Sequence, residues 1–219
     1  MLMAALGIYD GYYLMIDWIN GLQNHADYVF FYYLSFTLKG WVFYLIPILI
    51  VYNLYDRNQR NLYGLTIKGI NLRGYLILLA VAAPFIIMAS FLPEFQAKYP
   101  FFKPWENAQI LGFNSTLFGV GYEIAYLLSF ILLEWMFRGA LVMGMDKLIK
   151  SHAILPVVGL YVLLHFGKPL PETITAIVGG YVLSVIAYYS RSIVAGCLIH
   201  VVIAMLMDLL GYVHHFLKQ

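Results

Sequence analysis

Five or six long apolar stretches dominate this sequence of 219 residues and constrain its fold more than any other feature. A helix needs roughly 20 mostly apolar residues to cross a bilayer. The stretches that approach this length lie at about 28–53, 74–92, 117–144, 153–166, 172–190 and 191–212. The fourth is short, and Pro169 and Pro171 interrupt its continuation because proline does not fit inside a helix. The sequence therefore predicts an all-α fold, a polytopic bundle of about six transmembrane helices.

The composition supports a membrane protein and excludes several soluble classes. Charged residues make up 11% of the chain and hydrophobic residues 63%, whereas an average soluble domain has about 25% charged residues. This composition excludes a cytosolic enzyme and a disordered chain, because too little polar surface is left to solubilise a globule. The net charge of +2 and the absence of a dense basic stretch exclude nucleic-acid binding. A single cysteine, Cys197, forms neither an internal disulfide nor a cysteine-type metal cluster.

The N-terminal segment, Met1 to about Leu22, permits two interpretations. Polar residues fall near one helical stripe, so the segment could lie in the membrane interface or span with that stripe facing protein. These residues are Asp10, Asp17, Asn20 and Asn24. The segment lacks a basic start and a small-residue cleavage site, so we do not expect a removed signal peptide.

Positive charges in short loops predict the orientation in the membrane. The basic loops are the alternate connections 54–73, 145–152 and 190–192, which all fall on one side, assigned as cytoplasmic. Their basic residues are Arg57, Arg60, Lys68, Arg73, Lys147, Lys150 and Arg191. The connection 93–116 falls on the other side. Its prolines and aromatic residues suit either an interfacial cap or lid, or an aromatic belt.

Three ionisable residues lie within the stretch 117–144, where each costs at least ~2.5 kcal/mol on insertion scales. Glu134 and Arg138 are four residues apart and so can pair on one helix face. Glu123 precedes Glu134 by about three helical turns and projects from nearly the same face. A structural ion pair between helices is one interpretation, and a functional site is the other.

Two histidines favour the functional interpretation. Counted from the predicted cytoplasmic turns, Glu134, His165 and His200 each lie roughly 14–18 Å into the membrane, at 1.5 Å per residue. Three helices therefore bring a carboxylate and two imidazoles to a common depth. Glu134 could accept a proton from water, one histidine could orient that water, and the other could stabilise the oxyanion formed on a scissile carbonyl. Arg138 would keep Glu134 ionised. A divalent metal such as zinc, bound by the same three residues, is the second possibility, although no HExxH pair supports it.

At these residues the sequence resembles the CPBP intramembrane protease family, also called the type II CAAX prenyl protease or Abi family. The family is marked by Glu-Glu-x-x-x-Arg, Phe-x-x-x-His and His-x-x-x-Asn/Asp motifs on separate membrane helices. Here the corresponding segments run from Leu133 to Arg138, from Tyr161 to His165, and from His200 to Ala204. The resemblance covers about 117–212, which we take as the motif-bearing core. Residues 1–116 supply N-terminal membrane helices and the aromatic-rich loop of a single integral membrane domain.

The chain departs from the family pattern at three positions. Leu133 stands where the family has its first Glu, Ala204 replaces Asn or Asp, and Tyr161 replaces Phe. The single-Glu first motif is similar to that of a bacterial branch. In such a branch, Glu172 and Asp208 could supply the missing acid groups, although Glu172 also suits a helix start.

The resemblance implies an intramembrane endopeptidase in a membrane expected to be the bacterial cytoplasmic membrane. Its substrate would be a membrane-anchored peptide or protein tail, with membrane lipid as its surroundings. In that reading Glu134, His165 and His200 are catalytic, and Arg138, Tyr161, Glu172, Asp208 and Glu123 support them. The alternative is a non-catalytic relative that acts as a binding, assembly or immunity partner, which the missing Glu and Asn favour.

Overall fold

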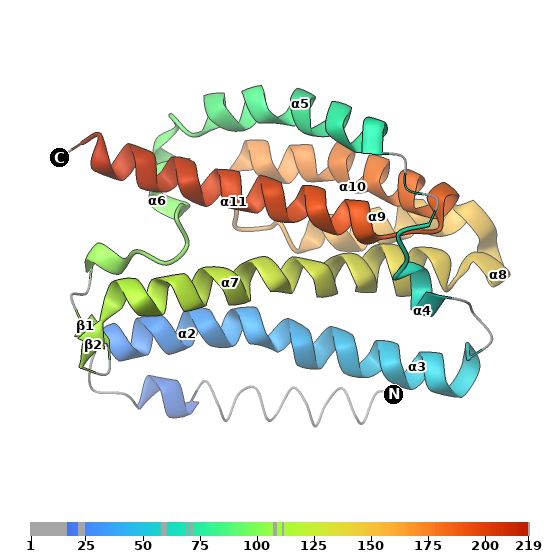
Figure 1. The fold of residues 1–219 in the computed structure, drawn as a ribbon, viewed down its shortest axis with the longest axis horizontal. Coiled ribbons are helices and arrows are strands. Elements are labelled where there is room, and N and C mark those ends of the chain that lie inside the picture. Colours follow the sequence, from blue (N-terminus) through green and yellow to red (C-terminus); the bar gives the residue numbers. More distant parts are fainter. Residues whose placement is uncertain are drawn as a thin grey trace.

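The computed structural model shows an all-α bundle whose long helices run nearly parallel to one another (Figure 1). It describes residues 17–21, 25–57, 61–68, 70, 72–106, 109–110 and 112–218. The helices of the first half are α2 (His25–Gly40), η1 (Trp41–Leu45), α3 (Ile46–Tyr55), α4 (Asn61–Gly64), α5 (Leu72–Ala89), α6 (Pro93–Lys98) and η2 (Pro104–Glu106). A two-residue hairpin, β1 (Gln109–Ile110) and β2 (Phe113–Asn114), precedes the second half. The remaining helices are α7 (Ser115–Glu134), η3 (Trp135–Met143), α8 (Asp146–Ile149), η4 (Lys150–Ala153), α9 (Ile154–Leu163), α10 (Leu170–Ser190) and α11 (Val194–Phe216).

Five helical stretches in the described part of the chain are long and apolar enough to cross a membrane: 38–55, 72–89, 115–163, 170–190 and 194–216. This confirms the predicted polytopic helical bundle, with five such stretches where about six were expected. The difference arises because the third stretch contains two of the predicted segments. Within it, α9 has only ten residues, about 15 Å of helix, which is half the thickness of a bilayer core.

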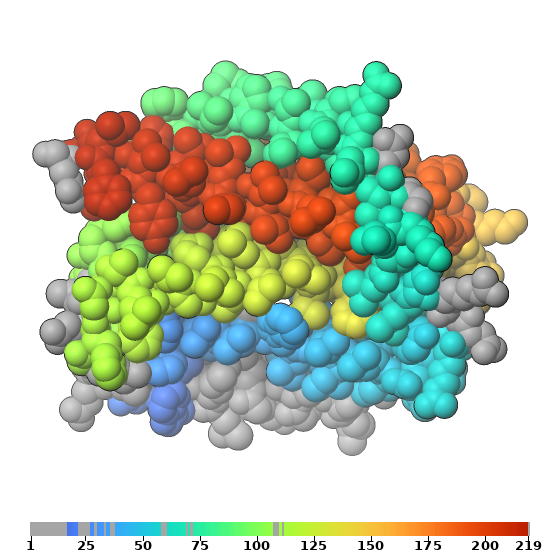
Figure 2. Space-filling model, in the orientation of Figure 1, coloured from blue at the N-terminus to red at the C-terminus, as the bar shows by residue number. Residues whose placement is uncertain are grey.

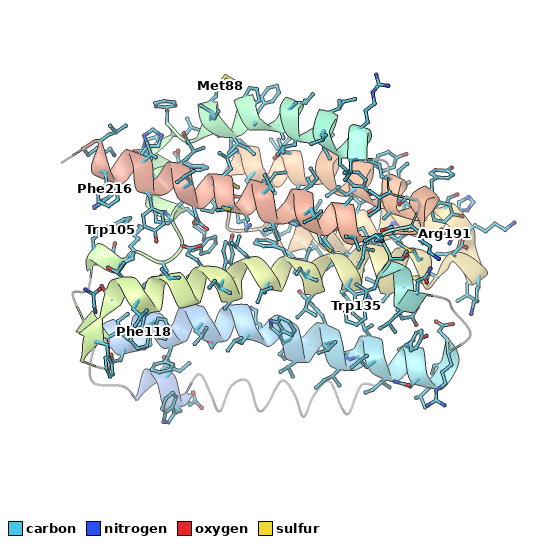
Figure 3. The ribbon with its side chains drawn as sticks, viewed as in Figure 1. Met88, Trp105, Phe118, Trp135, Arg191 and Phe216 are labelled. Carbon is cyan, nitrogen blue, oxygen red and sulfur yellow. The ribbon has the colours of Figure 1, made fainter. Side chains whose placement is uncertain are left out.

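Helix α7 and its π-helical continuation η3 lie at the centre of the bundle. Helices α2 and α11 pack against α7, while α10 packs against α9 and η3. Helix α5 covers α11 from outside, and Figure 2 shows α5, α11 and α7 forming successive bands on one face. Most of α5 faces outward: Tyr75 is buried, whereas Met88 is 60% exposed and points away from the bundle (Figure 3). Such an apolar outer surface is what lipid-facing helices require.

The three predicted cytoplasmic loops meet at one end of the bundle. Lys147 Nζ lies 2.8 Å from Asp56 Oδ1, and Arg191 Nη2 lies 2.9 Å from Asp146 Oδ2. The backbone N–H of Ile193 also donates to the carbonyl of Gly64. Figure 3 shows Arg191 at this end, opposite Trp105 and Phe216. The loops therefore share one side, as the charge pattern predicts, although their assignment to the cytoplasm stays a prediction.

The connection 93–116 forms a cap over the opposite end of the bundle, made of α6, η2 and the hairpin (Figure 1). Three of its aromatic side chains, Phe95, Tyr99 and Phe102, are 1–2% exposed. The aromatic-belt interpretation is therefore wrong for these three residues, because they pack inward against protein. The N-terminal segment lies largely outside the described residues; within it, Asp17 and Asn20 are exposed and Ile19 is buried.

Candidate active site

A buried ion pair lies at the junction of α7 and η3. Arg138 Nη1 lies 3.0 Å from Glu134 Oε1, and the two side chains are 1% and 0% exposed. Their spacing of four residues places both on one helix face, as predicted. The π-helical turns follow directly after Glu134, and such turns occur frequently at functional sites.

Helix α11 brings His200 to the same carboxylate. His200 Nδ1 lies 2.9 Å from Glu134 Oε1, although the two residues are 66 positions apart. The ring of Phe130, one helical turn before Glu134, covers the imidazole with ring centroids 4.4 Å apart. Glu134 and His200 therefore meet, as the residue counts from the loops predict.

Tyr161 of α9 lies between the two histidines. Its hydroxyl is 3.4 Å from His200 Nε2, and its ring centroid is 4.7 Å from that of His165. The guanidinium of Arg138 lies over the face of the same ring, with Cζ 4.2 Å from the centroid. His165 follows the end of α9 and its Nδ1 lies 3.2 Å from the carbonyl of Tyr161. Tyr161 therefore contacts three of the predicted site residues, Arg138, His165 and His200.

These contacts assign the histidine tautomers. A carbonyl oxygen and a carboxylate only accept hydrogen bonds, so Nδ1 of His165 and Nδ1 of His200 are the donors. In the neutral rings each Nε2 then carries a lone pair. The Nε2 of His200 accepts from the Tyr161 hydroxyl, and the Nε2 of His165 is available to water or substrate.

Two glycines of the site were not predicted. A Cβ at Gly196 would lie 3.0 Å from Glu134 Oε2, and a Cβ at Gly180 would lie 2.9 Å from the ring of Tyr161. Gly196 precedes His200 by four residues and so shares its helix face. That spacing is the one sequence signal that could have identified it.

Several polar atoms of the ion pair have no hydrogen-bonding partner among the described residues. They are Glu134 Oε2 and the Arg138 nitrogens Nε, Nη1 and Nη2, of which Nη1 makes the ionic contact with Glu134 Oε1. Buried polar atoms are nearly always paired with protein or with ordered water. The two side chains therefore do not satisfy one another completely, and polar atoms remain for water or substrate.

The residues do not fit the metal centre that was the second possibility. Within the part of the chain that the structure describes, no group of three or more His, Cys, Asp and Glu side chains is arranged to hold a metal ion. Glu134 Oε1 already contacts Arg138 and His200, and a guanidinium beside the carboxylate would repel a second cation. We therefore derive no step through a metal.

The remaining predicted acids lie toward the cap. Glu172 accepts hydrogen bonds from the hydroxyl of Tyr99 at 2.7 Å and from Lys168 Nζ at 2.5 Å. Asp208 Oδ1 accepts from the backbone N–H of Phe101 at 2.9 Å, and Glu123 interacts electrostatically with Asp208. Burial and the neighbouring Glu172 carboxylate raise the pKa of Tyr99, so its phenol stays a donor.

The structure thus separates the predicted residues into two groups. Glu134, Arg138, Tyr161, His165 and His200 form the candidate active site. The contacts of Glu172 and Asp208 anchor the cap, and Glu123 joins them, although Glu172 stays within electrostatic range of His165.

Two of the three positions that depart from the family motifs, Leu133 and Ala204, lie in apolar surroundings. Leu133 packs beside the core cluster that contains Phe137 and Val157. Ala204, one turn after His200, is 3% exposed. Neither position brings a polar group to the site, whose polar side chains are those of Glu134, Arg138, Tyr161, His165 and His200.

A scan against protein-family models matches residues 116–206 to the family described as type II CAAX prenyl endopeptidase Rce1-like. The matched segment contains Glu134, Arg138, Tyr161, His165 and His200. Neither the search of curated proteins nor the search of solved structures found a match.

Proposed function

We propose, from the match of residues 116–206 to the model of the Rce1-like type II CAAX prenyl endopeptidases, that the chain is an intramembrane endopeptidase. It would hydrolyse a peptide bond in a membrane-anchored peptide or protein tail. The observation that carries the proposal is the contact of Arg138 and His200 with one buried oxygen of Glu134. Side chains of η3 and α11 thereby hold a carboxylate of α7 whose second oxygen, Oε2, remains unpaired among the described residues.

Water activation is the first proposed step. Glu134 Oε2 takes a proton from water while the water oxygen bonds to the scissile carbonyl carbon. His165 Nε2 accepts a hydrogen bond from the other O–H of that water, because its Nδ1 is committed to the Tyr161 carbonyl. Arg138 keeps the carboxylate ionised in the apolar interior, where an isolated charge would be costly.

Collapse of the tetrahedral intermediate is the second step. His200 takes a proton from solvent water at Nε2 as the substrate binds, donates it as a hydrogen bond to the oxyanion and keeps it when the intermediate collapses, while Nδ1 still donates to Glu134 Oε1. The C–N bond then breaks, and the leaving nitrogen takes the proton that Glu134 holds. The carboxylate is regenerated and the products are a carboxylic acid and an amine.

The test is cleavage of tethered substrates by the full chain in proteoliposomes. Glu134→Gln and His165→Ala should each lower cleavage by at least about a hundredfold, the usual contribution of a general acid–base group. Glu94→Gln and His152→Ala are matched controls, because both residues are exposed and lie outside the site. Equal cleavage by all five proteins would contradict the catalytic assignment.

Substrate class and metal dependence are addressed by the same assay. The panel contains membrane-anchored peptides with and without a prenyl group, each incubated with and without a chelator. Preference for the prenylated peptides would extend the activity in the family's name to this chain. Loss of cleavage with chelator, restored by zinc, would contradict the metal-independent steps above.

A non-catalytic binding or assembly role is the second candidate. It is favoured by the complete burial of Glu134 and by apolar Leu133 and Ala204 at positions where the family carries polar groups. In that case His165→Ala should leave partner capture from the membrane unchanged, and no peptide in the panel should be cleaved by the wild type.

A further inference from the structure

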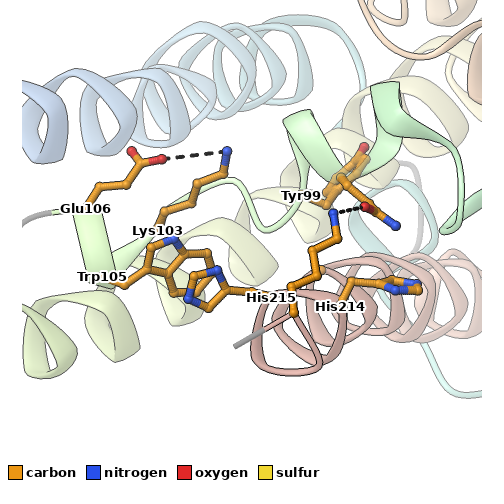
Figure 4. A pocket seen from close by; sticks show the side chains of 9 residues that line it. Tyr99, Lys103, Trp105, Glu106, His214 and His215 are labelled. Atoms are coloured by element: carbon orange, nitrogen blue, oxygen red, sulfur yellow. Dashed lines mark hydrogen bonds and ion pairs between the residues drawn. The ribbon is translucent and has the colours of Figure 1, made fainter.

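A polar pocket of about 130 Å³ lies at the cap end of the bundle, away from Glu134. Figure 4 shows side chains from the cap and from the last turns of α11 converging on it. Its lining residues are Gln96, Tyr99, Lys103, Trp105, Glu106, Gly211, His214, His215 and Lys218. The volume exceeds that of several water molecules at about 30 Å³ each, so a small polar group fits.

The two lysines give the pocket its positive character. Lys103 is only 22% exposed and donates to the carbonyl of Ala97 at 2.9 Å, with the Glu106 carboxylate at the longer distance of 3.8 Å. Lys218 Nζ donates to Gln96 Oε1 at 2.5 Å. Each ammonium carries three donors, so both retain hydrogen-bonding capacity beyond these contacts.

Packing holds the pocket in shape. The indole of Trp105 stacks on the ring of His215 with centroids 3.6 Å apart and planes inclined by 10°. His214 Nε2 lies 2.9 Å from Ser90 Oγ. Gly211 lets the cap approach closely, since a Cβ there would lie 2.4 Å from Pro100 N. The pocket is therefore built by long-range contacts between the cap, α11 and the end of α5.

Exposed apolar side chains border the pocket. Phe91 is 68% exposed and its ring contacts that of His214 at 4.8 Å, while Phe216 is 62% exposed and lies 6.3 Å from the ring of Trp105. In a membrane such residues face acyl chains. Lysine and tryptophan beside an apolar surface are typical of the level at which lipid head groups lie.

We propose that this pocket binds a phosphate group, and that its source is an anionic phospholipid whose acyl chains lie against Phe91 and Phe216. Lys103 and Lys218 would donate to the phosphate oxygens, and Trp105 would lie beside the glycerol region. Glu106 opposes this binding, but it lies at the rim, 56% exposed, and carries one charge against two. The proposal is independent of the proteolytic function.

The experiment compares lipid retention by the full chain in phosphatidylcholine nanodiscs with and without phosphatidylglycerol, measured by native mass spectrometry. The variant is Lys103→Gln/Lys218→Gln. Its matched control, Lys98→Gln/Lys150→Gln, removes two charges that do not line the pocket. We expect the wild type and control to retain phosphatidylglycerol, and the pocket variant to bind it about tenfold more weakly, as expected for lost charge-assisted contacts.

A third arm adds inorganic phosphate to phosphatidylcholine nanodiscs and follows the unfolding temperature. Phosphate stabilisation that only the pocket variant loses would support the phosphate site and assign its source to solution. Equal phosphatidylglycerol retention by both double variants would overturn the proposal.

A second measurement serves if the pocket variant fails to fold. Brominated phosphatidylglycerol should quench wild-type fluorescence more than brominated phosphatidylcholine, and Trp105→Phe should remove that difference. Equal quenching by the two lipids would overturn the proposal.

Discussion

Gly196 of α11 lies against the Glu134 carboxylate so closely that a Cβ at this position would be 3.0 Å from Oε2. Arg138 and His200 both hold the other oxygen, so the carboxylate has little freedom to move away. Oε2 is itself buried, so the missing side chain at position 196 decides how much room remains beside it.

Gly196→Ala should lower peptide cleavage by about tenfold or more while leaving the fold intact, because a shift of about 1 Å at a reacting group is costly. The measurement is the initial cleavage rate in proteoliposomes together with the unfolding temperature. Gly121→Ala in α7 is the matched control, since a Cβ there meets nothing within 4 Å. Unchanged cleavage by Gly196→Ala would show that Oε2 does not need this space.

The buried pair Glu134–Arg138 is expected to stabilise the fold. Arg138→Met leaves an unpaired buried carboxylate and should cost about 3–5 kcal/mol. The double variant Glu134→Gln/Arg138→Met should be less destabilised than the sum of the two single variants, because it leaves no buried charge unpaired. Chemical unfolding in detergent micelles measures the free energy of unfolding of the wild type, the two single variants and the double variant. Strict additivity would mean that the two charges do not interact.

The hydroxyl of Tyr99 ties the cap to α10 through Glu172. Tyr99→Phe removes this donor and should destabilise the protein by about 1–3 kcal/mol, the cost of an unmade buried hydrogen bond. The cap should open locally, so limited proteolysis within 93–116 should become faster. Tyr189→Phe, a 75% exposed position at the other end of the bundle, is the control. Identical digestion of the two variants would contradict an anchoring role for Tyr99.

Much of the fold and half of the site followed from local sequence rules. The apolar stretches predict the helices because lipid allows few other backbone structures. The spacing of Glu134 and Arg138 predicts their pairing, and counting residues from the loops predicts the meeting of Glu134 with His200. Both arguments work because a helix advances by a constant rise per residue.

The rest depends on how helices approach one another. Nothing within α11 alone shows that Gly196 faces Glu134, because that contact depends on the distance between α7 and α11. Likewise, the burial of the cap aromatic residues depends on distant contacts such as that of Tyr99 with Glu172, 73 residues apart. Composition suggested an aromatic belt because it carries no information on such distant pairs.

Asp56 is expected to stabilise the fold in a pH-dependent way. Burial disfavours its charged form, but the hydrogen bond and charge of Lys147 and the hydroxyl of Tyr63 hold its pKa below the ordinary value of 3.8. A pKa that is lower in the folded state stabilises the fold at pH values above the pKa of the unfolded state, and this stabilisation is lost as the pH falls through the pKa of the folded state.

Asp56→Asn should therefore lower stability by about 1 kcal/mol at neutral pH, a modest effect because Lys147 is 56% exposed. The difference from wild type should shrink as the pH is lowered below 3.8. Thermal unfolding across this range measures it, with exposed Lys68→Gln as the control. A difference that does not change with pH would show that the charge of Asp56 contributes nothing.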